Sequence, residues 1–402
     1  MKRFTVAIFF ALYLALQATA QVAVKGETVY TMAGSPIKDG VVLIKDGKIE
    51  QVGSASQVKI PANYKLYQAK VVTPGLIDAH TVVGLAGYLN QAHDQDQLDR
   101  GSPFQPELRA IDSYNAEEVL VGWVRSFGIT TIHTGHSPGA LVSGQTMVAK
   151  TRGKNVEQAT IIASSMIAAT LGESAVVRDG KSPGTRSKLI AVLRGELIKA
   201  QEYLRKQGLG EDKRPAKDLK MEALSQLLKG ETRLLVTVHR ANDILSALRI
   251  AKEFNIKLVL DGVAEGYTVI DEIKASGFPV IIHPTMLRPA GEAENMTMEA
   301  ASKLMKAGIA VALQSGSEDY VPKTRVVLFE AATAAANGLS FEEALATITV
   351  NAARILGIDK RVGSLEVGKD GDIAMFDGDP FEYTTHVTAV IIEGEVVSNQ
   401  QR

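Results

Sequence analysis

Apolar and polar positions alternate with two different periods between residues 73 and 348. Short apolar runs, rich in Val, Ile and Leu, are separated by longer segments whose apolar residues recur every three to four positions. This alternation is typical of βαβ units, which place parallel strands side by side in one sheet. We expect strands at residues 75–80, 129–133, 234–239, 257–261, 279–283 and 309–315.

Helical patterns fill the intervals between these strands. We expect helices at residues 189–206, 219–229, 242–254, 297–307 and 326–337. Two further strands fit more weakly, at residues 146–150 and 160–164. Together with the six strands above they would make eight βα units, the number that closes a TIM-type barrel. The pattern therefore predicts an α/β fold with a (β/α)8 barrel over residues 73–348.

Both ends of the chain show a different pattern, in which short β-type runs are separated by glycine turns. Residues 41–44 and 48–53 flank Asp46-Gly47, a dipeptide that strongly favours a β-hairpin. Residues 372–376 and 389–397 repeat the pattern near the carboxyl terminus. We therefore expect a small discontinuous β-sandwich domain built from both chain ends, residues 21–72 and 349–402.

The first twenty residues have the pattern of a secretory signal peptide. Two basic residues precede an apolar run over residues 4–16, and Ala18-Thr19-Ala20 supplies the small residues that signal peptidase accepts before Gln21. The run is shorter than the roughly 20 residues that a membrane span needs. We expect a periplasmic or secreted protein with no membrane attachment after signal removal, and a signal anchor is the alternative.

Composition narrows the range of partners and ligands. Removal of residues 1–20 leaves 42 basic against 45 acidic side chains, a formal charge near −3. This balance gives no electrostatic basis for binding nucleic acid or an anionic membrane, so we expect a small-molecule substrate and leave a homo-oligomer open. Because the chain has no Cys, any metal must be held by His, carboxylates or a modified Lys.

Most of the seven histidines fall at or near the ends of expected strands. In a parallel barrel the carboxyl ends of the strands form the catalytic face. Four strands end in a histidine, a fifth histidine follows one of them closely, and a carboxylate ends a further strand; these residues are His80, His133, His239, His283, His136 and Asp261. We expect all six side chains to line one rim.

Neutral imidazole is a ligand for Zn, Fe, Ni or Mn, and a bound divalent ion makes hydroxide available near neutral pH. The residues expected to hold such an ion are His80, His239, His133 and His136. We assign the proton-transfer roles to Asp261 and His283. A single histidine at a strand end is more often a hydrogen-bonded structural residue, and Asp261 has the alternative role of capping the turn that begins at Gly262.

Several segments resemble the amidohydrolase superfamily, in the branch related to imidazolonepropionase. Residues 72–80 resemble the family's entry strand, and residues 351–357 with 363–372 resemble its exit from the barrel. Residues 29–53 resemble the opening β segment. The resemblance implies a barrel with a composite β domain and metal-assisted hydrolysis of a C–N bond other than an ordinary peptide bond, in an amide, a cyclic amide or an acyl-amino compound.

The resemblance carries only part of the family's usual ligand set. His80 matches the first histidine of the His-x-His motif, but Val82 stands at the second. His239 matches the histidine of the fifth strand. Gly262 stands where the sixth strand has a histidine, and Ser315 stands where the eighth has an aspartate.

Three hypotheses follow from this incomplete set. The metal, with zinc as first choice and iron, manganese or nickel as alternatives, is held at a migrated site that uses His133, His136 or His283. Alternatively, the barrel works without metal through an imidazole base. In the third hypothesis the chain is an inactive binding protein. Lys150 ends a strand and is expected to expose its amine, and carbamylation to a bridging ligand is the alternative.

Overall fold

The computed structural model describes residues 21–178, 182–283, 289–316 and 326–402. The expected signal peptide, residues 1–20, lies outside the described residues. No helix within these ranges is both long enough and apolar enough to cross a membrane.

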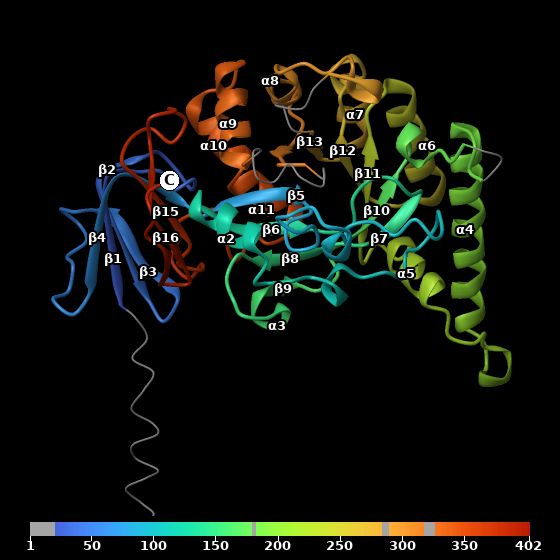
Figure 1. Ribbon diagram of the computed structural model, residues 1–402, viewed down its shortest axis with the longest axis horizontal. Helices are drawn as coiled ribbons and strands as arrows, with labels where there is room; N and C mark the ends of the chain where they lie inside the picture. Colours follow the sequence, from blue (N-terminus) through green and yellow to red (C-terminus); the bar gives the residue numbers. More distant parts are fainter. Residues whose placement is uncertain (1–20, 179–181, 284–288, 317–325) are drawn as a thin grey trace, which may run out of the picture.

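Strands from the two chain ends form one sheet; the expected β-sandwich, which needs two sheets packed face to face, does not appear among the described residues. Figure 1 shows the first strands in blue beside the last strands in red, at one end of the molecule. Seven strands pair in the order β17-β16-β15-β4-β1-β2-β3, all antiparallel to their neighbours except β1 and β4. Their bounds are Val22–Val29, Ile37–Lys45, Lys48–Ser54 and Lys65–Pro74 for β1 to β4, and Ile373–Phe376, Val387–Ile392 and Glu395–Ser398 for β15 to β17. Hydrogen bonds thus join both ends in a single mixed sheet.

The hairpin between β2 and β3 shows why the local sequence folds in this way. Asp46 and Gly47 both have positive φ angles, 53° and 78°, which is the geometry that Asp-Gly adopts in two-residue hairpin turns. On either side of the turn, Ile44 and Ile49 pair across the strands and are fully buried. The turn and the apolar pair together fix the register of this edge of the sheet.

The rest of the chain contains a six-stranded and a four-stranded sheet. The first has the order β14-β13-β12-β11-β10-β7, and β10 to β14 are parallel. The second has the order β5-β6-β8-β9. The strands are β5 Leu76–Thr81, β6 Ile129–Thr134, β7 Val142–Gln145, β8 Met147–Lys150, β9 Thr160–Ile162, β10 Met166–Thr170, β11 Arg233–Val238, β12 Leu258–Gly262, β13 Val280–Ile282 and β14 Val311–Leu313. All six of the more firmly expected strands are confirmed.

Helices pack against these two sheets. Their bounds are α2 Val119–Ser126, α3 Val156–Ala159, α4 Arg186–Gln207, α5 Leu219–Leu228, α6 Ala241–Phe254, α7 Ile270–Ser276, α8 Ala300–Lys306, α9 Val327–Ala336, α10 Phe341–Thr347 and α11 Val350–Leu356. All five expected helices are confirmed. Buried side chains recur at intervals of three and four along α6, which places its apolar face against the sheet.

The two weaker strand predictions were wrong in their pairing. β8 lies antiparallel to β6, and β9 pairs antiparallel with β8, so neither contributes a parallel βα unit. The parallel strand in this part of the chain is β10, which pairs with β11 and was not predicted. Hydrophobic periodicity identifies strands but carries no information about their direction.

The two sheets come together at both of their edges. β7 and β8 are consecutive along the chain and belong to different sheets, so residues 142–150 join them. At the other edge, an isolated parallel bridge links Thr81 to Gly316. No strand ladder among the described residues closes these sheets into a continuous ring. The architecture shown is therefore a mixed α/β fold with an additional sheet from the chain ends.

Candidate functional site

A buried histidine–aspartate pair lies at the carboxyl ends of β5 and β12. His80 Nδ1 is 3.1 Å from Asp261 Oδ1, and the two side chains are only 1% and 2% exposed. Asp261 also accepts hydrogen bonds from Thr237 Oγ1 at 2.6 Å and Gln314 Nε2 at 2.7 Å. We call these four residues the rim cluster. They come from four different strands or strand ends, because parallel strands bring their carboxyl ends to one edge.

The pair has a defined electrostatic character. Burial lowers the pKa of His80, but the charge of Asp261 and its hydrogen bond outweigh burial and raise that pKa above its ordinary value. Burial raises the pKa of Asp261, but the charge of His80 and the three hydrogen bonds outweigh it and lower that pKa. Nε2 of His80 is buried and has no hydrogen-bond partner within the described ranges. The free nitrogen is thus the one that faces away from Asp261.

Two more histidines lie close together, directly after β11 and β13. The ring centroids of His239 and His283 are 6.4 Å apart, with an angle of 74° between the planes. Nδ1 of His239 and both nitrogens of His283 are buried without partners in the part of the chain that the structure describes. Burial lowers the pKa of both residues, to about 3 for His283, so both imidazoles are neutral near pH 7.

His133 has no nitrogen available for a ligand. Nδ1 is 2.7 Å from the carbonyl oxygen of Ala79, and Nε2 is 2.7 Å from Thr146 Oγ1. Burial lowers the pKa of His133 to about 3, and the ring lies 5.8 Å from the ring of His80. Its contacts join β6 to β5 and to the β7–β8 junction, which is a structural role.

His136 lies in the loop after β6, against the backbone of β7. A Cβ added at Gly144 would be 2.3 Å from Cδ2 of the His136 ring, so the glycine leaves room for the imidazole. Burial lowers the pKa of His136 to about 4, and both nitrogens are buried without hydrogen-bond partners among the described residues. The structure therefore places this ring on β7.

Three positions of the family's ligand set are filled in ways that exclude a cation. Val82 is fully buried. Gly262 has a φ of +84°, and a Cβ there would lie 2.6 Å from Cε1 of His239, so the His239 ring occupies the space of a side chain. The Ser315 N–H donates to Asp78 Oδ1 at 3.0 Å, and its hydroxyl donates to Thr81 at 3.1 Å.

The residues present do not fit the divalent metal that the resemblance implied. Within the described ranges, no group of three or more His, Asp or Glu side chains could hold a metal ion. Both carboxylate oxygens of Asp261 already accept hydrogen bonds, and two imidazoles bind a cation weakly compared with the three or four ligands of ordinary sites. We therefore derive no chemical step through a metal.

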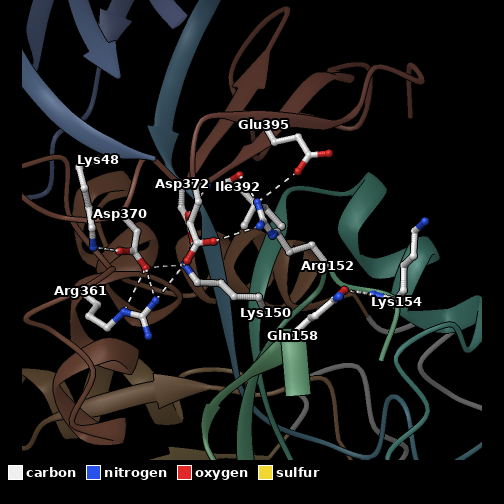
Figure 2. Close-up of polar contacts among 11 residues, drawn as sticks. Lys48, Lys150, Arg152, Lys154, Gln158, Arg361, Asp370, Asp372, Ile392 and Glu395 are labelled. Carbon is white, nitrogen blue, oxygen red and sulfur yellow. Dashed lines mark hydrogen bonds and ion pairs between the residues drawn. The ribbon is translucent and has the colours of Figure 1, made fainter. Parts of the chain in front are cut away.

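Lys150 does not expose its amine, contrary to expectation. Its Nζ lies 2.9 Å from Asp370 and 2.5 Å from Asp372, and its side chain is 3% exposed (Figure 2). Because β8 runs antiparallel to β6, Lys150 pairs with Thr131 near the amino end of β6, away from the rim. An ammonium held by two carboxylates is a structural ion pair rather than a metal-bridging carbamate.

Sequence reasoning missed three residues of the site. Thr237 and Gln314 hold Asp261, and Asp78 binds the Ser315 backbone. Burial raises the pKa of Asp78 to about 6, while the hydrogen bonds from Ser315 and His80 oppose that shift. Asp78 and Thr237 are polar residues within mainly apolar strands, and Gln314 directly follows one; that pattern was the available signal.

Comparisons with known proteins agree with the architecture. A sequence profile described as the amidohydrolase family matches residues 269–398. The crystal structure of an amidohydrolase from Thermotoga maritima MSB8 superposes with a TM-score of 0.88 at 30% identity, covering 94% of this chain and all of that one.

Two curated relatives agree with this placement. The imidazolonepropionase of Brucella anthropi is 25% identical over 397 residues, which cover 85% of this chain and 87% of that protein. Amidohydrolase tasK of Hapsidospora irregularis is 24% identical over 388 residues, covering 88% of this chain but only 39% of tasK. The chain belongs to the amidohydrolase superfamily, in the branch related to imidazolonepropionase.

Proposed function

We propose that this protein hydrolyses a C–N bond, in an amide, a cyclic amide or an acyl-amino compound other than an ordinary peptide, with the His80–Asp261 pair as its acid–base group. Family membership supports hydrolysis of a C–N bond. The observation that carries the proposal is the buried pair itself. Asp261 holds one imidazole nitrogen of His80 at 3.1 Å, and the other nitrogen has no partner among the residues that the structure describes.

The chemistry follows from this arrangement. When the neutral His80 ring carries its proton on Nδ1, that N–H donates a hydrogen bond to Asp261. The lone pair on Nε2 is then available to a water molecule. The water oxygen forms a bond to the substrate carbonyl carbon while Nε2 takes its proton, and the Asp261 carboxylate stabilises the imidazolium. The same proton then passes to the leaving nitrogen as the C–N bond breaks, so that the imidazole is regenerated.

His239 and His283 can contribute to the same step. A neutral imidazole carries one N–H, and both nitrogens of His283 lack partners in the described part of the chain. Their lowered pKa values keep both rings neutral, so they offer hydrogen-bond donors without adding charge to the rim. Such donors stabilise the oxyanion that develops when water attacks the carbonyl.

Members of the amidohydrolase family generally use a divalent metal such as zinc. In this chain His80 and His239 alone stand at the family's ligand positions, and the hydrogen bonds to His80 and Asp261 form a complete acid–base group without an ion. For the fold, we propose that residues 73–348 form the family's (β/α)8 barrel and residues 21–72 and 349–402 its composite domain. We further propose export through residues 1–20.

The test combines a substrate screen with metal analysis of the purified protein. Amides, cyclic imides and acyl-amino acids are assayed with wild type, His80→Ala and Asp261→Asn, and with His93→Ala as an exposed histidine control. We expect both site variants to lose about 10²–10⁴-fold in kcat/KM. Wild-type kcat/KM should rise with pH through the raised pKa of His80, since the base must be unprotonated.

Each other outcome has a distinct meaning. One ion per chain that is lost in both His80→Ala and His239→Ala, with activity that follows it, would replace the His–Asp mechanism by a metal site. Absence of hydrolysis across the whole panel would favour a binding protein that has kept only the fold. Equal loss in His93→Ala would show that the assay does not report on the rim.

A further inference from the structure

A cavity lies on the face opposite the rim. It has a volume of about 820 Å³ and is lined by residues of three connections, α5 to β11, α6 to β12 and α7 to β13. These connections lead into the amino ends of β11, β12 and β13, which are parallel to one another. The histidines lie at the carboxyl ends, so this basal cavity is separate from the proposed catalytic site.

The floor of the basal cavity is apolar. Leu228, Leu248 and Phe278 line it, and each is half-buried and packed on the main hydrophobic core. The part of each side chain that remains exposed faces into the cavity, where no other element of the described chain covers it. Apolar surface of this kind is stabilised when an apolar ligand removes it from water.

The margin of the basal cavity is cationic. Lys229, Arg249, Lys252 and Lys257 line it, against one carboxylate, that of Glu272. These four cations form no ion pair within the described residues, and the Arg249 guanidinium donates only to the Ser246 hydroxyl.

Glu253, the acidic neighbour of Lys252, does not neutralise this margin. Its two carboxylate oxygens bind Arg194 of α4 at 2.7 Å and 2.9 Å, on the other flank of α6. The whole chain has a formal charge of only −1, so the positive charge around the cavity is local. It attracts anions over short range.

We propose that the basal cavity binds an amphipathic anion, a carboxylate on an aliphatic chain of the fatty-acid class. The aliphatic chain covers the apolar floor, and the carboxylate meets the lysines at the margin. A volume of about 820 Å³ is within the range of small-molecule sites. A concave site of this size suits a single ligand molecule.

The experiment is calorimetric titration of the purified protein with sodium dodecanoate below its micellar concentration. We expect saturable binding with one site, weakened at least tenfold in the double variant Lys252→Glu/Lys257→Glu. Lys274→Glu, the same charge change on an exposed residue of α7 outside the lining, should bind within twofold of wild type. Phe278→Ser should weaken the binding of dodecanoate without changing the charged residues at the margin. The melting temperature of each variant shows whether it is folded.

Three further probes separate the contribution of the charged group from that of the aliphatic chain. Acetate and inorganic phosphate should bind at least tenfold more weakly than dodecanoate, and so should uncharged dodecanol. Equal binding of phosphate would overturn the proposal in favour of a simple anion site, and equal binding of dodecanol would overturn the role of the lysines. Absence of dodecanoate binding at millimolar concentration would overturn the proposal outright, while leaving the proposed hydrolase function untouched.

Discussion

Two polar clusters built around buried carboxylates differ in how completely their atoms are paired. One is the rim cluster. The other, which we call the junction cluster, lies where the seven-stranded sheet formed by both chain ends meets β8. It consists of Lys48, Lys150, Arg361, Asp370 and Asp372 (Figure 2). Both contain carboxylates that are at most 3% exposed. Their chemistry is nevertheless very different.

The junction cluster is saturated and the rim is not. Asp370 binds three cations, and Asp372 binds Lys150 and the backbone N–H of Glu393. Around the rim, His80, His239 and His283 keep buried nitrogens without partners among the described residues. Buried polar atoms in folded proteins are nearly always paired, so unpaired ones need a reason such as a ligand or a reaction. The comparison assigns stability to the junction and chemistry to the rim.

Breaking the junction should have the largest effect on stability. Lys150→Met removes the buried cation and leaves Asp370 and Asp372 without their shared partner, which should cost about 3–5 kcal/mol of unfolding free energy. Denaturant unfolding measures the loss. Lys48→Met is the matched control, because Lys48 is 51% exposed and its ion pair should contribute less than about 1 kcal/mol. If both variants lose the same unfolding free energy, the burial of Lys150 does not make its ion pairs more important than that of Lys48.

Acid should destabilise the fold through its neutral imidazoles. His133, His136 and His283 have pKa values lowered to about 3, 4 and 3, whereas unfolded histidine titrates near 6.5. The unfolded state therefore binds protons first as pH falls below 6.5, and each ring should cost on the order of 2 kcal/mol between pH 7 and pH 5. Asp78 and His80, whose pKa values are raised, bind protons in the folded state and oppose part of this loss.

Denaturant unfolding across this pH range measures the effect. His136→Gln removes one of the imidazoles with a lowered pKa and should flatten the pH dependence of the unfolding free energy between pH 6.5 and pH 4. His93→Gln, which changes an exposed histidine, should leave it unchanged. If the free energy of unfolding does not fall between pH 7 and pH 5, the claim that these buried imidazoles stay neutral in the folded state is wrong.

The sequence predicted the strands and the histidines that follow them, because apolar runs and polar strand ends are local features. Strand β5, which ends in His80 and Thr81, is one example, and the β2–β3 hairpin is another. Strand direction is not local, which is why β8 was expected to be parallel and Lys150 to be exposed.

Partner choice within the site could not be read from the sequence either. His80 and Asp261 are 181 positions apart, and their contact depends on the arrangement of β5, β12 and β14. His133 and His239 both lie at strand ends, yet both nitrogens of His133 have partners, whereas Nδ1 of His239 has none among the described residues. What distinguishes them is the side chain that each meets, such as Thr146 for His133.

Adding one carbon atom at Gly262 should disturb the rim without touching the junction. Gly262→Ala places Cβ 2.6 Å from the His239 ring at a φ of +84°, so ring and backbone must both shift. We expect a loss of about 1–3 kcal/mol in unfolding free energy. Gly277→Ala is the control, since φ is +70° there but nothing lies within 4 Å, and only the backbone cost of about 1 kcal/mol applies. Equal losses of unfolding free energy in the two variants would show that the His239 ring moves aside without an energetic cost.

The smallest change tests whether the rim cluster tunes its histidine. Thr237→Val keeps the shape of the side chain and removes one of the three hydrogen bonds to Asp261, which should cost about 1 kcal/mol. Without that bond the pKa of Asp261 rises and its carboxylate becomes a stronger acceptor for the His80 proton, so the raised pKa of His80 should rise further. Proton NMR of the imidazole measures that shift, and Thr333→Val, in α9, should leave it unchanged. If removal of the threonine hydroxyl costs stability but does not move the His80 pKa, the rim cluster is held together like the junction, and its unpaired nitrogens need an explanation other than acid–base chemistry.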